Sequence, residues 1–328
     1  MTEIFDITII GAGPVGLFTG FYAGLRQAKV KIIDSLEQVG GQPHHLYPEK
    51  YIYDIPGFPK INGHELAIEL SKQLELFPHQ LCLGEEVEMI QFDNETETYQ
   101  VKTQKETHLT KTIIIAAGNG AFNPKKLTLA GIETFEKSNL HYYVKSIDSY
   151  KNKRIAILGG GDSAVDWALS LSEVASQVYL IHRRDKFRAL ESSVAALNRS
   201  NVKILTPYLM DDYQANGFHI ETIQLSKVKS DETLTLEIDD VIVNYGFSSS
   251  MGPIRQWGLN IERNGIIVNS FLETNLPGVY AVGDIANYPG KMKLIATGFG
   301  EAPMAVNQAI RYIHPEQKQV PIHSSDLF

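Results

Sequence analysis

The sequence has a single cysteine, Cys82, and no apolar run near the roughly 18 residues that a membrane-spanning helix needs. One cysteine excludes an intramolecular disulfide and any multi-cysteine metal site. Low-complexity tracts are also missing. The first residues carry acids where a signal peptide would carry bases. We therefore expect a cytoplasmic globular protein with no metal and no membrane segment.

Positive charge is also in short supply, because the 328 residues carry a formal net charge of -8. An acidic chain argues against a nucleic-acid partner, although a local basic patch remains compatible with the total. A hydrophobic content of 43% over this length is enough to bury two ordinary cores. Composition thus favours a two-domain enzyme and leaves the partner open.

One pattern occurs twice: an apolar strand-like run, a glycine-rich turn, an amphipathic helical stretch and a second strand-like run. The first copy extends from Ile7 to Asp34, and the second from Arg154 to His182. Each predicts a βαβ unit of a doubly wound parallel sheet. The fold class expected is therefore α/β, with two Rossmann-like three-layer dinucleotide-binding domains.

Two segments rich in turn-forming residues, Asn119–Pro124 and Asn244–Ser250, enclose the second copy. The simplest architecture inserts the second domain into the first. Residues 1–118 and 247–328 would then form one nucleotide-binding domain, with the C-terminal tail, and residues 119–246 the other.

The first glycine turn has the pattern Gly11-x-Gly13-x-x-Gly16. Missing side chains permit a tight turn, close approach of the backbone to a pyrophosphate, and close packing of helix on strand. Asp34 lies 23 residues beyond Gly11, at the end of the next strand, where a carboxylate can accept both ribose hydroxyls. This spacing predicts a dinucleotide without a 2′-phosphate, such as FAD.

The second turn, Gly159-x-Gly161-x-x-Ala164, is followed at the same spacing by His182 instead of an acid. Guanidinium groups match phosphate geometry, whereas a carboxylate would repel a 2′-phosphate. The sequence therefore predicts NADPH here, and the alternative for the basic run is a solvated surface cluster. The candidate residues after the strand are His182, Arg183, Arg184 and Arg188.

Two dinucleotide sites in one chain suit an enzyme in which a diffusing hydride donor reduces a fixed flavin. From the first turn to Gly283-Asp284, the motifs resemble those of the thioredoxin-reductase-like flavoproteins in order and spacing. Thioredoxin reductases need a C-x-x-C pair shortly before the second turn, and that stretch, His141–Asp148, has no cysteine.

The chain more closely resembles the bacterial ferredoxin–NADP reductases of thioredoxin-reductase type. Five segments carry this resemblance: Tyr47–Asp54, Asn119–Phe122, Gly159–Trp167, His182–Arg188 and His323–Ser325. The resemblance implies FAD, NADPH, a ferredoxin or flavodoxin acceptor, and a homodimer whose C-terminal tail helps to cover the flavin. It also implies FAD contacts at Asp34, Gln42, Tyr47, Val87, Phe122, Asp284 and Ser325.

Some of these residues also have chemistry of their own. Tyr47 and His323 are flat side chains that can stack on a flavin ring, with a core aromatic and an unstructured tail as the respective alternatives. Asp284 follows a strand-like run and can cap a helix whose N-terminus faces the flavin. Four lysines are candidates for a basic face toward an acidic acceptor: Lys125, Lys126, Lys291 and Lys293.

Hydride transfer from NADPH to flavin requires no side-chain acid or base, so we assign no catalytic residue. Flavin accepts electrons in pairs and can release them singly, which links NADPH to a one-electron carrier. Two alternatives stay open at this point. One is an NADPH-dependent reductase of a low-molecular-weight disulfide, and the other is a non-enzymatic flavin redox sensor.

Overall fold

A computed structural model describes residues 3–144 and 146–316, with the side chains of 121–123 and 248–249 left undescribed. It divides into two compact units, Met1–Ala121 with Ser249–Phe328 (unit 1) and Phe122–Ser248 (unit 2). Two short strands, β9 (Ala121–Pro124) and β18 (Phe247–Ser250), pair where the chain passes between the units.

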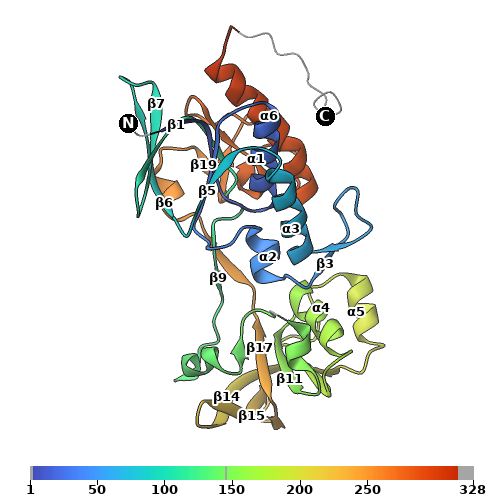
Figure 1. The fold of residues 1–328 in the computed structure, drawn as a ribbon. Helices are drawn as coiled ribbons and strands as arrows, with labels where there is room; N and C mark the ends of the chain where they lie inside the picture. The colour runs from blue at the N-terminus through green and yellow to red at the C-terminus, as the bar shows by residue number, and fades with distance from the viewer. Residues whose placement is uncertain (1–2, 145, 317–328) are drawn as a thin grey trace. The chain divides into compact units, whose positions relative to one another are not determined.

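Unit 1 is built on a seven-stranded sheet in the order β5-β2-β1-β8-β7-β6, with β21 beside β8. Figure 1 labels its strands β1, β5, β6 and β7. Strands β5, β2, β1, β8 and β21 are parallel, and β6, β7 and β8 form an antiparallel meander. The strands are β1 (Ile4–Ile10), β2 (Val30–Asp34), β5 (His79–Leu83), β6 (Val87–Asp93), β7 (Thr98–Thr103), β8 (Thr107–Ile115) and β21 (Val279–Ala281).

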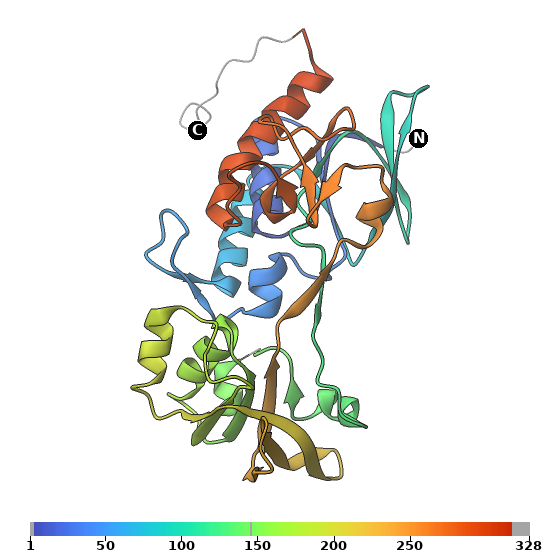
Figure 2. The same cartoon turned by 180° about the vertical axis from the view of Figure 1, so that it is seen from behind.

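Helix α1 packs against α3 and α6, and α1 and α6 both contact β1 (Figures 1 and 2). Buried isoleucines of β1, β2 and β8 pack into the core beneath them, as expected for parallel strands covered by helices. The helices of unit 1 are α1 (Pro14–Leu25), α2 (Gly41–Leu46), α3 (Gly63–Leu74) and α6 (Ile295–Ile313), with 3₁₀ turns η3 (Gly252–Gln256) and η4 (Gly283–Ile285). Short strands complete it: β3 (Tyr51–Ile52), β4 (Ile61–Asn62), β19 (Ile261–Glu262), β20 (Gly265–Ile267) and β22 (Ala286–Asn287).

Unit 2 has a parallel five-stranded sheet in the order β10-β17-β11-β12-β13 and a separate antiparallel sheet, β14-β15-β16. The parallel strands are β10 (Leu140–His141), β11 (Arg154–Gly159), β12 (Gln177–Ile181), β13 (Lys203–Leu205) and β17 (Asp240–Asn244). The other elements are β14 (Tyr208–Asn216), β15 (His219–Lys227), β16 (Thr233–Glu237), α4 (Asp162–Leu171), α5 (Glu191–Leu197), η1 (Ile132–Lys137) and η2 (Ile147–Tyr150).

The two parallel sheets share one topology around their glycine turns. In unit 1 the order is β5-β2-β1-β8, and in unit 2 it is β13-β12-β11-β17. Each glycine turn therefore joins a central strand, β1 or β11, to a helix that leads to the neighbouring strand, β2 or β12. The internal duplication expected from the sequence is present in the structure. Within the described ranges, no helix has both the length and the apolar character that a bilayer crossing requires.

Candidate functional site

The first glycine turn joins β1 to α1, and two of its glycines are required by the fold itself. Gly11 has φ +112°, and a Cβ there would lie 2.5 Å from the carbonyl oxygen of Ala116. A Cβ on Gly16 would lie 1.9 Å from the carbonyl oxygen of Gly11. Gly13 differs, because its φ is -72° and a Cβ there would meet nothing nearer than 3.8 Å.

The second glycine turn, between β11 and α4, repeats this arrangement position by position. A Cβ on Gly159, which has φ +157°, would lie 2.4 Å from the carbonyl oxygen of Asn244 and 3.0 Å from the Cβ of Ala164. A Cβ on Gly161 would again meet nothing nearer than 3.8 Å. The packing of the protein itself therefore does not require a glycine at the middle position of either turn.

A phosphate bound close to the backbone would account for the two middle glycines. Gly13 and Gly161 are the N-cap residues of α1 and α4, and neither helix has a side-chain cap at its N-terminus. The first-turn N–H groups of both helices can therefore donate to a phosphate, and glycine lets the phosphate approach the backbone. The residues present fit a dinucleotide pyrophosphate at each turn.

Asp34 ends β2 and contacts the first turn directly. One carboxylate oxygen accepts from the backbone N–H of Ala12 at 2.5 Å, and the other accepts from Leu36 at 2.8 Å. Burial raises the pKa of Asp34, and these two hydrogen bonds oppose that rise. Each carboxylate oxygen keeps a further lone pair for a ribose hydroxyl, so the geometry is compatible with the role predicted for this residue.

The basic segment after β12 is attached to the second turn by its backbone. The N–H of Arg188 donates to the carbonyl oxygen of Gly160 at 2.7 Å, and the N–H of Leu190 donates to Asp162 at 2.9 Å. Arg183, Arg184 and Arg188 are exposed, and none of the three forms an ion pair with any residue that the structure describes. Three guanidinium groups are thus available beside one glycine turn.

His182 lies against this turn, since a Cβ on Gly160 would be 2.4 Å from its ring. Burial, together with the charges of Arg184 and Arg183, lowers the pKa of His182, so its ring is neutral at pH 7. Its Nε2 and the Oδ1 of Asn244 are buried without a hydrogen-bond partner within the described part of the chain. Two orphaned polar atoms next to the turn are a further feature that fits a bound polar ligand.

On the unit 1 side, Asp284, Tyr47 and Gln42 lie near the first turn. Asp284 is in η4 and accepts from the side chain of Asn119 at 3.3 Å, and it caps no helix, so the predicted cap is wrong. Burial and the charges of Asp284 and Asp54 raise the pKa of Tyr47 to about 12. Gln42 is in α2, and its Nε2 would lie 3.0 Å from a Cβ on Gly118.

The other predicted FAD contacts cannot all be placed. Val87 begins β6, and its side chain is buried in the core of unit 1. Phe122 is in β9, but its side chain lies outside the described residues. His323 and Ser325 also lie outside them, so their predicted roles stay predictions.

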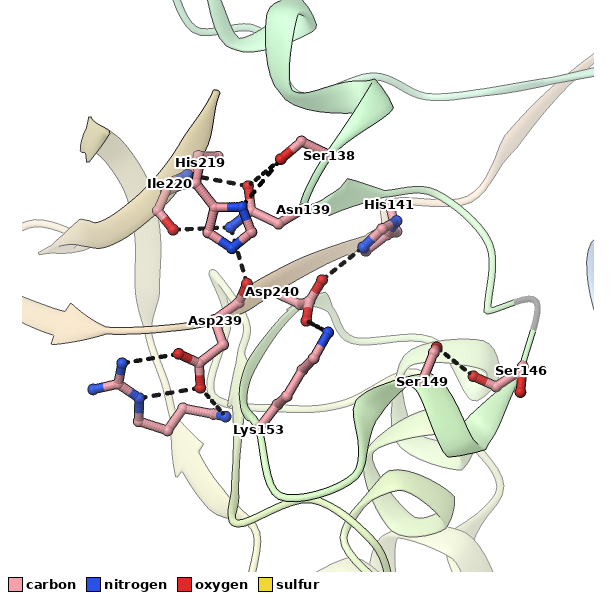
Figure 3. A network of polar contacts seen from close by, with 11 residues as sticks. Ser138, Asn139, His141, Ser146, Ser149, Lys153, His219, Ile220, Asp239 and Asp240 are labelled. Carbon is pink, nitrogen blue, oxygen red and sulfur yellow. Dashed lines mark hydrogen bonds and ion pairs between the residues drawn. The ribbon is translucent and has the colours of Figure 1, made fainter. Parts of the chain in front are cut away.

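The stretch that would hold a dithiol instead contains a polar network, seen in Figure 3. Nε2 of His141 lies 2.7 Å from Oδ1 of the buried Asp240, and Lys153 donates to Oδ2 of Asp240 at 2.9 Å. Asn139 donates to the backbone of Ile220 at 2.8 Å and accepts from it at 3.0 Å. These contacts hold β10 against β17 and β15, and none of the side chains involved can exchange electrons.

Cys82 is buried in β5, as a core thiol would be, beside Glu106 and His108. Burial raises the pKa of its thiol, so the thiol is protonated at neutral pH. The ammonium of Lys31 lies 2.9 Å from Nδ1 of His108 and supplies positive charge to this cluster. A protonated, enclosed thiol is a poor nucleophile.

Sequence reasoning missed two residues of unit 1 and misplaced a third. Asn119 contacts Asp284, and Glu301 of α6 contacts Gly283, and both contacts depend on tertiary structure. Lys291 was predicted to lie on a basic face, but its side chain is buried against Glu301. Lys293 is exposed and donates to Asn119 at 2.8 Å.

Comparisons with known proteins agree with this geometry. Residues 5–309 match the pyridine nucleotide-disulphide oxidoreductase family. The chain is 55% identical to ferredoxin–NADP reductase 2 of Oceanobacillus iheyensis, covering 100% of this chain and 99% of that protein. It is 53% identical to ferredoxin–NADP reductase of Enterococcus faecalis, covering 99% and 97% respectively.

Solved structures show the same fold. The thioredoxin reductase of Lactococcus lactis superposes with a TM-score of 0.78 at 26% identity, covering 94% of this chain and 99% of that one. The bacillithiol disulfide reductase of Staphylococcus aureus, 17% identical with a TM-score of 0.73 over 96% of this chain and 100% of that one, shares the fold alone.

These findings confirm the fold class, the family and the cofactors predicted from the sequence. The fold is the two-domain α/β fold of thioredoxin reductases, the cofactors are FAD and NADP(H), and the protein is an oxidoreductase. The chain belongs to the pyridine nucleotide-disulphide oxidoreductases, in the group of its relatives named ferredoxin–NADP reductase.

Proposed function

We propose that this enzyme passes electrons from NADPH through FAD to ferredoxin or flavodoxin. One observation carries the proposal: two equivalent glycine turns occur in a chain that has no pair of cysteines, and the second turn is followed by three arginines that pair with no acid among the described residues. A dithiol relay is therefore impossible, and reduced flavin must deliver electrons to an outside acceptor directly. The names of the two relatives support ferredoxin as that acceptor.

Unit 1 is the proposed FAD-binding unit and unit 2 the NADPH-binding unit. The acid after the first turn is Asp34, whose carboxylate suits the two hydroxyls of an unphosphorylated ribose. The second turn is followed by Arg183, Arg184 and Arg188, which suit a 2′-phosphate. The two turns have the same backbone form, and the charge of the side chains that follow each turn would determine which dinucleotide it binds.

Bound FAD supplies the change from paired to single electron transfer, and the protein's residues bind and orient. The N–H groups at the start of α1 would donate to the FAD pyrophosphate, and Asp34 would accept from its ribose. Asp284 would accept from a ribityl hydroxyl, and Tyr47, whose raised pKa keeps its phenol neutral, would pack on the flavin ring. No residue is required to take or give a proton, so none is assigned as an acid or base.

The finer features of the proposal come from the resemblance to bacterial ferredoxin–NADP reductases and from the positive charge of exposed lysines. They are a homodimer, a C-terminal tail with His323 and Ser325 over the flavin, flavodoxin as a second acceptor, and a cytoplasmic location. Lys293 is exposed and donates to Asn119, which in turn donates to Asp284, and it is our candidate for contact with an acidic acceptor.

Acceptor assays on the purified holoenzyme test the proposal. Anaerobic NADPH should bleach the flavin absorbance, and added ferredoxin or flavodoxin should restore it. Small disulfides and thioredoxin should not restore it at comparable rates. Rapid turnover with a small disulfide would favour the alternative reductase, and a flavin spectrum unchanged by NADPH would favour a redox sensor.

A further inference from the structure

Glu301, on α6, is a buried carboxylate that collects three hydrogen-bond donors from one short segment. Its side chain is 5% exposed. Oε2 accepts from the backbone N–H of Gly283 at 2.7 Å. Oε1 accepts from the hydroxyl of Tyr288 at 2.5 Å and from the ammonium of Lys291. The three donors are distributed along Gly283–Lys291, the segment that contains Asp284.

Lys291 balances the charge that this arrangement buries. Its side chain is also 5% exposed, so the pair is enclosed and neutral as a whole. Burial, followed by the contact with Glu301, raises the pKa of Tyr288, which keeps its hydroxyl protonated as a donor. An unpaired charge at this depth would be strongly destabilising, and the three donors with the ammonium satisfy the carboxylate.

The segment held by Glu301 lies against the first glycine turn. Gly283 has φ +73°, a conformation that most side chains disfavour, and a Cβ there would be 3.4 Å from Val15. A Cβ on Gly298 of α6 would be 2.3 Å from the same Val15, which belongs to the Gly11–Gly16 turn. The peptide that precedes Asp284 is thus fixed between Glu301 on one side and the pyrophosphate turn on the other.

We propose that Glu301, neutralised by Lys291, is the positioning residue that fixes the Gly283–Asp284 peptide and so aims the Asp284 carboxylate at FAD. This inference rests on the proposed function, in which Asp284 contacts FAD. A pair of apolar side chains would fill the same space, but would leave the N–H of Gly283 without an acceptor. An acceptor at this point ties the left-handed Gly283 to α6 through its N–H.

Reconstitution of the apoprotein with FAD provides the test. The double variant Lys291→Met/Glu301→Met removes both buried charges together, so no unpaired charge remains, and it also removes the acceptor for the N–H of Gly283. We expect its dissociation constant for FAD to rise at least tenfold, measured by flavin fluorescence at a temperature where the apoprotein is folded. Tyr288→Phe removes one donor without altering any charge, and we expect at least a threefold rise.

A matched control is available in unit 2, where Lys153 pairs with the buried Asp240 at 2.9 Å. Lys153→Met/Asp240→Leu removes a pair whose carboxylate is also buried, at 4% exposed, although its lysine is 43% exposed. It should leave the FAD dissociation constant within twofold of the parent, even where the melting temperature falls. If Glu301 were only structural, its double variant would behave in the same way, which would overturn the inference.

Asp284→Asn separates this inference from the proposed function. We expect it to weaken FAD binding, and normal binding would refute the assignment of Asp284 itself. If Asp284→Asn weakens binding while the Glu301 double variant stays within twofold of the parent, the positioning role alone is wrong. If the double variant does not fold, Tyr288→Phe decides, and parent affinity in that variant overturns the inference.

Discussion

The carboxylate of Asp34 accepts a hydrogen bond from the backbone N–H of Ala12 at 2.5 Å, across 22 residues of sequence. This contact joins the end of β2 to the first glycine turn, so the proposed ribose acceptor is tied directly to the proposed pyrophosphate site. Burial nevertheless raises the pKa of Asp34, because the ionised form loses hydration that two backbone donors only partly replace.

This raised pKa predicts an acid-sensitive affinity for FAD. Ribose hydroxyls favour the ionised carboxylate, so FAD binding should weaken as the pH falls through the raised pKa of Asp34, above the range where an ordinary aspartate titrates. The stability of the apoprotein should show the opposite sign, since protonation of Asp34 removes the cost of burying its charge, so this residue's contribution to stability should improve on acidification. Titrations with FAD at several pH values measure how its dissociation constant changes with pH.

Asp34→Asn is the control for that pH dependence. It should bind FAD more weakly at pH 7 by about 2 kcal/mol, the typical value of hydrogen bonds to a charged group. Its affinity should also lose the pH dependence ascribed to Asp34. An equal slope in parent and variant would place the titrating group elsewhere.

Gly13→Ala should separate binding from folding. The protein has room for the added Cβ and the backbone has negative φ, so the stability of the apoprotein should change by less than about 1 kcal/mol. The same Cβ would meet the pyrophosphate, so FAD affinity should fall. Gly11→Ala is the contrasting variant, because its Cβ would clash with Ala116 and should impair folding. Chemical denaturation of the apoprotein and FAD titration measure the two effects.

Arg183→Ala/Arg184→Ala should reduce the preference for NADPH over NADH. Two charge-assisted contacts to the 2′-phosphate would be lost, so kcat/KM for NADPH should fall by about 2 to 4 kcal/mol in free-energy terms, while that for NADH changes little. Arg199→Ala, an exposed arginine of the same unit, is the control and should leave the preference intact. Unchanged discrimination in the double variant would mean that the phosphate binds elsewhere.

The parts predicted from sequence are those that depend on neighbours in the chain. The glycine turns, Asp34 and the arginines belong to βαβ units, where strand, turn and helix follow one another and a fixed spacing sets the geometry. Glu301 and Asn119 were missed because their partners depend on the packing of α6 and η4. Asn119 and Asp284, for example, are 165 residues apart.

The error at Lys291 has a similar physical origin. A lysine in a polar segment is ordinarily exposed, and only a buried carboxylate on another element reverses that expectation. Glu301 lies 10 residues further on, inside a helix whose buried face the sequence alone did not identify. The predicted cap at Asp284 failed because a 3₁₀ turn, and not an α-helix, follows β21.

The last prediction concerns the electron acceptor. Cys82 is the chain's only cysteine and a buried, protonated thiol, so Cys82→Ser should keep near-normal NADPH-dependent reduction of ferredoxin or flavodoxin. Neither the parent enzyme nor this variant should reduce thioredoxin. Added salt should slow the reaction with an acidic acceptor by screening local cations. Lys293→Gln should slow it too, whereas Lys102→Gln, an exposed lysine on β7, should not. Stopped-flow reoxidation of the reduced flavin measures each rate. Robust thioredoxin reduction, or loss of acceptor activity in Cys82→Ser with FAD still bound, would contradict direct transfer from flavin.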